Sequence, residues 1–206
     1  LVDKYAVKEY VANIIGKEYV IPTIGVWDKP EDIDWDNLPN KFVLKTTHGG
    51  GSVGVVICKD KKNFDRNEAI KKLNKSLKQD IYIELREWPY KNVKKRIIAE
   101  PLLENPNTID ADLNDYKFFC FNGKVKFLYL SEGLENHDTA RISYVSLDWK
   151  PMPFARDDYK PFEQLPHKPE NLEEMIRIAE ELSASLDESK SSEYTVRTSM
   201  SGVIKG

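Results

Sequence analysis

The chain has 206 residues, of which 31 are basic and 34 acidic, giving a formal net charge of −3 at pH 7. The length suffices for one larger domain or two small ones with a real core, and the nearly balanced charge argues against a dedicated nucleic-acid binder. The sequence shows no signal-peptide pattern and no apolar run of membrane-spanning length. We therefore expect a cytoplasmic protein with no membrane span.

The first predicted element is a helix over residues 3–16. Its apolar residues recur at helical spacing, Asp3 is a candidate N-cap, and Gly16 is a candidate residue to end the helix. Lys4 and Lys8 are four residues apart and therefore share one face. Helix lysines usually lie on a solvated face; the alternative is that Lys8 reaches toward bound phosphates.

A strand, a glycine-rich turn and a second strand are predicted within residues 41–60. The turn contains Gly49, Gly50, Gly51, Ser52 and Gly54. Consecutive glycines carry an entropic cost, but they let the backbone approach an anion and point several N–H groups at it. Lys45, which ends the first strand, can meet a phosphate as a point charge. This segment alone fits a nucleotide triphosphate site and an ordinary flexible hairpin equally well, and it matches neither the P-loop nor the dinucleotide-binding pattern.

A surface helix and then an apolar strand are predicted in the next part of the chain. The lysine-rich residues 59–79 predict a surface helix, with Ile70, Leu73 and Leu77 on its inner face. After it, residues 96–103 predict an apolar strand that runs into Glu100 and Pro101. A carboxylate beside free backbone groups at a strand end is what the edge of adenine needs, since its N6 amine donates and its N1 accepts.

The second half of the chain predicts a hairpin followed by a strand and a helix. Residues 115–121 alternate, Asn122-Gly123 makes a tight turn, and residues 124–130 return. Asp115 and Lys117 are two apart and face the same side of their strand, where they would suit ribose hydroxyls and a phosphate. A strand over residues 141–147 and an amphipathic helix over residues 170–186 follow. The stripe of this helix is Leu172, Met175, Ile176, Ala179 and Leu182.

The last segment, residues 187–206, has five serines and no carboxylate pair. Its composition predicts a polar, disordered tail. Cys58 and Cys120 both lie in apolar strand contexts and are expected to be buried thiols. The three histidines are scattered without the spacing of a zinc site.

At this point the sequence resembles the ATP-grasp superfamily, and most closely its TupA-like branch. The resemblance rests on DKYAVKEYV, on residues 21–49, on REWPYKNVKKRIIAEPLLEN and on DYKFFCFNGKV, all in the family's order. It covers roughly residues 1–182. It implies an α+β fold with two lobes of mixed sheet and helices. The small lobe would comprise residues 41–101, preceded by a helix and linker over residues 1–40, and residues 102–186 would form part of the large lobe.

The resemblance also implies roles for individual residues. Lys8 and Lys45 would bind ATP phosphates, and the turn of residues 49–54 would cover the β- and γ-phosphates. Glu100 and the backbone near Leu102 would bind adenine, and Asp115 with Lys117 would bind ribose and phosphate. In the family, ATP phosphorylates a carboxylate, an amine attacks the acyl phosphate, and Mg²⁺ bridges the phosphates.

The sequence departs from the family where the magnesium ligands are expected. An Arg-x-Asp word and a later Glu-containing word should follow the helix over residues 170–186, and residues 187–206 replace them with the serine-rich segment. The chain also starts at Leu1, without a methionine. We therefore expect a fragment that lacks both the family's N-terminal start and its metal-binding strands, a C-terminally incomplete fold that binds ATP without turnover. The expected activity is a remnant of a carboxylate–amine ligase of bacterial cell-surface polysaccharide biosynthesis, with an acidic polysaccharide or peptide precursor as possible partner.

Two alternative functions remain open at this stage. The first is a nucleotide-binding accessory protein. The second is a glycosyltransferase, although its only sequence support is Asp110-Ala111-Asp112, which lies in a polar loop and is expected to be solvated.

Overall fold

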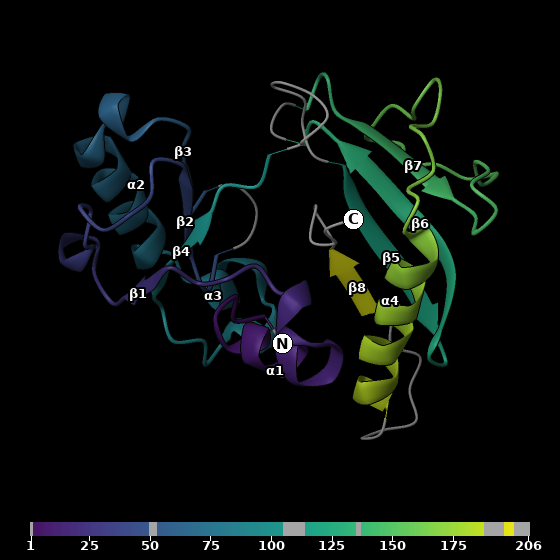
Figure 1. Cartoon of the computed structure of the whole chain (residues 1–206), viewed down its shortest axis with the longest axis horizontal. Helices are drawn as coiled ribbons and strands as arrows, with labels where there is room; N and C mark the ends of the chain where they lie inside the picture. Colours follow the sequence, from purple (N-terminus) through teal and green to yellow (C-terminus); the bar gives the residue numbers. More distant parts are fainter. Residues whose placement is uncertain (1, 50–52, 105–113, 135–136, 188–195, 200–206) are drawn as a thin grey trace. The chain divides into compact units, whose positions relative to one another are not determined.

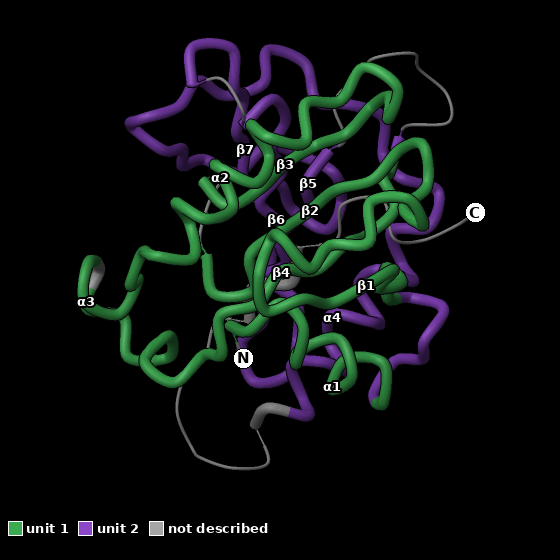
Figure 2. The backbone as a smooth tube through the Cα atoms, turned by 90° about the vertical axis from the view of Figure 1, so that its left-hand side faces the viewer, with its two compact units in different colours: residues 1–13, 20–103 green, residues 14–19, 104–206 purple. Residues whose placement is uncertain are grey.

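The computed structural model describes residues 2–49, 53–104, 114–134, 137–187 and 196–199 (Figure 1). The chain divides into two compact units, coloured separately in Figure 2. Unit 1 comprises Leu1–Asn13 and Val20–Leu103, and unit 2 comprises Ile14–Tyr19 and Glu104–Gly206. The helix and linker that the sequence analysis set apart as residues 1–40 thus fall largely within unit 1. Among the described residues, no helix has both the length and the apolar character needed to cross a membrane.

Unit 1 is built on a four-stranded sheet in the order β1-β4-β2-β3. The strands are β1 (Gly25–Trp27), β2 (Phe42–Thr46), β3 (Val55–Cys58) and β4 (Ile97–Pro101), and the helices are α1 (Ala6–Ile15), α2 (Arg66–Lys78) and α3 (Ile81–Leu85). The second predicted strand of residues 41–60 begins at Val55, and Val53 and Gly54 form part of the turn. Asp65 caps α2 by accepting hydrogen bonds from the amides of Asn67 and Glu68.

The core of unit 1 lies between α2 and one face of this sheet. Helix α2 packs on β2 and β3 (Figure 1). The buried residues there are Phe42, Leu44, Val56, Cys58, Ala69, Leu73, Ile97 and Ala99. Because side chains alternate along a strand, the intervening residues of β2 and β4, which include Lys45 and Glu100, point to the opposite face.

Unit 2 contains a second four-stranded sheet in the order β7-β6-β5-β8. Its elements are β5 (Asp115–Phe121), β6 (Lys124–Glu132), β7 (Arg141–Val145), β8 (Val196–Ser199) and α4 (Leu172–Asp187). Asn122 and Gly123 both have positive φ, 50° and 70°, as the predicted tight hairpin turn requires. Helix α4 packs against β5, β6 and β8.

Three features of the sheets and helices differ from the sequence expectations. Neighbouring named strands are antiparallel throughout the described ranges, whereas mixed sheets were expected. The strands of unit 1 that run in the same direction, β1 with β2 and β3 with β4, are in each case separated by one antiparallel strand. Val196–Ser199 forms a strand paired with β5 inside the segment for which disorder was predicted. In α4, Ile178 is buried at 1% exposure while Ile176, which was assigned to the inner stripe, is only half-buried.

Two isoleucine substitutions can test which face of α4 is buried, which we call the phase of the helix. Ile178→Ala should lower the free energy of unfolding by about 2–5 kcal/mol, the usual cost of emptying a fully buried isoleucine site. Ile176→Ala is the matched control, with the same chemical change at a half-buried site, and should cost about 1 kcal/mol or less. Urea unfolding followed by circular dichroism measures both, and an equal or larger loss for Ile176→Ala would contradict the observed phase.

Candidate functional site

A buried glutamate between two lysines is the centre of the site in unit 1. Glu100 is 4% exposed. One of its carboxylate oxygens contacts Lys8 Nζ, and the other lies 2.7 Å from Lys45 Nζ. Burial by itself raises the pKa of the Glu100 carboxyl, but the charges and hydrogen bonds of Lys45 and Lys8 outweigh it and leave the pKa below its ordinary value. Glu100 is therefore a carboxylate at neutral pH.

The register of the sheet explains why Glu100 meets Lys45. Strands β2 and β4 pair so that Val43 lies opposite Glu100 and Lys45 opposite Ile98. Lys45 and Glu100 are thus diagonal neighbours on one face, within reach of a long side chain. Lys8 reaches the same carboxylate from α1, and its Nζ also donates to the carbonyl of Ile21 at 2.6 Å. The structure therefore brings together Lys8, Lys45 and Glu100, which the sequence placed in one site.

Lys4 is a further site residue, which the sequence analysis left aside in favour of Lys8. Its Nζ donates to the carbonyl oxygen of Gly49, the first glycine of the turn. Burial, and next the nearby charge of Lys45, lower the pKa of Lys4 below the ordinary lysine value. The only available sequence signal was its i, i+4 spacing from Lys8, which places both lysines on one face without saying which of them approaches the turn.

The glycine turn packs closely on α2 at both of its described ends. A Cβ at Gly54 would lie 2.0 Å from Thr46 Oγ1 and 2.5 Å from Ser76 Oγ, and a Cβ at Gly49 would lie 2.7 Å from Thr46 Oγ1. The two hydroxyls are themselves 2.9 Å apart. These two glycines are therefore required by close packing whether or not a ligand binds. Gly50, Gly51 and Ser52, the other predicted turn residues, lie outside the described residues.

His48 belongs to the base of the turn. It is buried, and its Nε2 lies 3.1 Å from the carbonyl oxygen of Ser76 on α2. Burial is the main cause that lowers the pKa of His48 below its ordinary value. A neutral imidazole anchored on α2 supports the turn and adds no charge for an anion.

Asp115 and Lys117, the predicted ribose and phosphate residues, belong to unit 2. Their side chains form an ion pair on one face of β5. The Lys117 ammonium also lies 4.8 Å from the ring centroid of Tyr129 on the neighbouring strand. Leu102, whose backbone was assigned to adenine, directly follows the last residue of β4 in unit 1 and is half-buried.

An all-protein metal site needs several His, Cys, Asp or Glu side chains close together. In the described part of the chain, no group of three or more of these residues is placed to hold a metal ion. The carboxylates near the turn are also already engaged: Glu100 with two lysines and Asp3 with Arg96. The Glu100 and Asp3 carboxylates are thus held by basic side chains, and the described residues form no all-protein site for Mg²⁺.

Unit 1 thus carries one ammonium group on the first glycine of the turn, that of Lys4, and two on the Glu100 carboxylate, those of Lys8 and Lys45. Residues 1–188 match the sequence model of the family described as TupA-like ATPgrasp, and the chain belongs to that family. Comparisons with curated proteins and with solved structures give no match. The resemblance noted from the sequence is thereby confirmed.

The ion pairs of Glu100 predict a pH-dependent contribution to stability. Glu100→Gln should lower the free energy of unfolding by about 1.5–3 kcal/mol at pH 7, because the charged hydrogen bonds to Lys8 and Lys45 are lost. The folded-state pKa of Glu100 is depressed, so its contribution is present above the unfolded pKa of about 4.3 and is lost as the pH falls through the folded pKa.

Urea unfolding at pH 7 and at stepwise lower pH measures this difference. The gap between the unaltered chain and Glu100→Gln should be constant near neutrality and should close in acid, where Glu100 is protonated. A gap that widens as the pH falls below 4 would show that the ion pairs do not stabilise the fold.

Proposed function

We propose that the chain binds ATP and that the lysines around Glu100 receive its phosphates. The single observation that carries the proposal is the convergence of Lys4, Lys8 and Lys45 on the glycine turn and the Glu100 carboxylate. Three ammonium groups beside one carboxylate leave an excess of positive charge, which a triphosphate would neutralise. Membership of the TupA-like ATPgrasp family supports the same ligand.

The roles proposed for individual residues follow the chemistry of the nucleotide. Lys45 and Lys4, which flank the turn, would bind phosphate oxygens together with the turn's backbone N–H groups. Glu100 is a buried carboxylate and would accept a hydrogen bond from the adenine N6 amine, beside the backbone at Leu102. Asp115 and Lys117 would serve the ribose hydroxyls and a phosphate.

The proposed reaction class is that of a carboxylate–amine ligase. In such a reaction the γ-phosphoryl group passes from ATP to a carboxylate oxygen and ADP leaves; an amine nitrogen then attacks the acyl carbon, phosphate leaves, and an amide forms. The part of this chain would be to hold the phosphates in place and to offset their charge. We propose an acidic precursor of a bacterial cell-surface polysaccharide, or a peptide, as the acceptor.

A lysine substitution tests the nucleotide site. Lys45→Ala should weaken ATP binding by roughly tenfold to a hundredfold, because a charge-assisted bond to phosphate contributes about 1.5–3 kcal/mol. Lys72→Ala, on the exposed side of α2, removes the same charge elsewhere in unit 1 and should leave the affinity unchanged. Isothermal titration calorimetry measures the dissociation constants. Equal affinity for ATP in Lys45→Ala and the unaltered chain would refute the assignment of Lys45.

We further propose that this chain binds ATP without turning it over. Its residues 187–206 carry Asp187, Glu188 and Glu193 but no carboxylate pair in an alternating strand pattern, which the family's metal-binding words require. With ATP and Mg²⁺, phosphate release should stay at the buffer background, measured by a coupled phosphate assay beside a version joined to a family C-terminus that carries those words. Mg²⁺-dependent ATP consumption by the present chain would refute this part of the proposal.

A further inference from the structure

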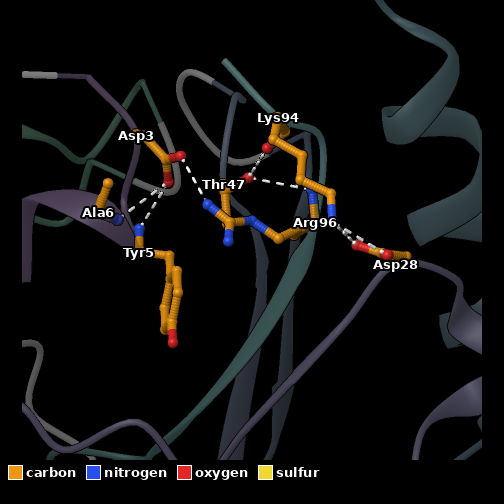
Figure 3. Close-up of polar contacts among 7 residues, drawn as sticks. All are labelled: Asp3, Tyr5, Ala6, Asp28, Thr47, Lys94 and Arg96. Atoms are coloured by element: carbon orange, nitrogen blue, oxygen red, sulfur yellow. Dashed lines mark hydrogen bonds and ion pairs between the residues drawn. The ribbon is translucent and has the colours of Figure 1, made fainter.

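A polar network at the start of α1 is not accounted for by the nucleotide contacts described above (Figure 3). One carboxylate oxygen of Asp3 accepts hydrogen bonds from the amides of Tyr5, at 2.9 Å, and Ala6, at 3.2 Å. The other oxygen accepts from the Arg96 guanidinium at 2.9 Å. Asp3 therefore caps the first turn of the helix segment and at the same time binds a residue 93 positions further along the chain.

Arg96 is fixed from several sides. Its guanidinium lies 4.6 Å from the ring centroid of Tyr5, as well as on Asp3. Its backbone extends the pairing of β2 and β4 by one step: the Arg96 carbonyl accepts from the Thr47 amide at 2.9 Å, and the Arg96 amide donates to Thr47 Oγ1 at 3.1 Å. Thr47 Oγ1 donates in turn to the carbonyl of Lys94 at 2.8 Å. Arg96 is thus held by both its side chain and its backbone just before the start of β4, a central strand of the sheet.

Lys4 links Asp3 and Thr47, two members of this network. It directly follows Asp3, its amide donates to the Thr47 carbonyl at 3.1 Å, and its ammonium is on the Gly49 carbonyl. A lysine side chain has high rotational entropy, so fixing its backbone reduces what must be ordered when it meets an anion. The anchor points of Lys4 are therefore Asp3, Thr47 and, through both of these, Arg96.

We propose that the Asp3–Arg96 ion pair is a positioning device that holds Lys4 at the glycine turn, ready for a phosphate group of the nucleotide. The inference rests on the proposed ATP site, and it assigns to Asp3 and Arg96 no contact with the ligand. The pair is largely shielded from water, with side-chain exposures of 17% for Asp3 and 18% for Arg96. Shielded, hydrogen-bonded pairs hold their geometry better than exposed ones, which contribute little.

A second ion pair in the same region provides the matched control. Lys94 and Asp28 are 2.9 Å apart, but their side chains are 64% and 59% exposed. Figure 3 shows both pairs, with Asp3 and Asp28 on opposite sides of Arg96. Substituting Lys94 removes a positive charge two residues from Arg96 while the backbone carbonyl used by Thr47 remains. Comparing substitutions in the two pairs therefore distinguishes the effect of losing the positioning contact from the effect of losing a nearby positive charge.

The experiment measures ATP dissociation constants by calorimetry for the unaltered chain, Asp3→Asn, Arg96→Met and Lys94→Met, well below their melting temperatures. Asn is as good an N-cap as Asp, so Asp3→Asn keeps the cap acceptor and loses the charged partner of Arg96. We expect both Asp3→Asn and Arg96→Met to weaken ATP binding by roughly tenfold, the effect of losing about one charge-assisted bond. Lys94→Met should bind as the unaltered chain does, and Arg96→Lys should restore part of the loss.

The same substitutions in a Lys4→Met background distinguish positioning from direct contact. If Asp3 and Arg96 act through Lys4, neither substitution should weaken binding further once the ammonium is gone. A tenfold loss that persists in the Lys4→Met background, or unchanged affinity in both single variants, would overturn this inference and leave the ATP site standing. Absence of ATP binding by the unaltered chain would overturn the proposed function and this inference together.

Discussion

The pairing of one buried carboxylate with two ammonium groups is the constraint on which the site depends. Glu100 lies in the middle of a sheet and could not remain ionised there alone, because a buried charge without a partner is strongly disfavoured. Lys45 and Lys8 supply the partners from a neighbouring strand and from α1. Helix α1 is therefore tied to the face of the sheet opposite α2 by a polar contact, while α2 is held on its own face by apolar packing.

One face of the sheet is apolar and packs on α2, while the other carries Lys45 and Glu100 beside the buried Val43 and Ile98. The turn leaves β2 after Thr46, and Thr46 and His48 contact Ser76 of α2. A Cβ at Gly49 or Gly54 would clash with the Thr46 hydroxyl, which is a packing reason for glycine at both positions. The two described ends of this segment, Gly49 and Gly54, are buried and closely packed, unlike the residues of an ordinary flexible hairpin.

How far the sequence could predict this site depends on the range of each interaction. Local patterns predicted the cap at Asp3 and the hairpin turn at Asn122-Gly123. They placed the ends of β2 and β4 one residue early, at Lys45 and Glu100 instead of Thr46 and Pro101. The choice of Lys8 over Lys4 was incomplete, because two lysines on one helix face are equivalent until tertiary packing places one on Glu100 and the other on Gly49. Arg96 was missed because its run of basic residues has the composition of a solvated face. Its partner lies 93 positions away. Strand β8 was missed because a serine-rich composition outweighed the alternation of Val196 and Thr198.

The lysines of the site differ from free cations, and this difference bears on how tightly a nucleotide can bind. Lys8 and Lys45 already hold Glu100, and Lys4 already holds a carbonyl oxygen. A phosphate oxygen that takes one of these ammonium groups therefore exchanges one hydrogen bond for another, and the net gain is much smaller than the gross strength of the new bond. At the proposed ATP site, an adenine amine would likewise have to share the Glu100 carboxylate with two lysines. A ligand that offers only anions, such as inorganic phosphate, would leave Glu100 with fewer partners than it has now, because each ammonium group that the anion takes is lost to the carboxylate.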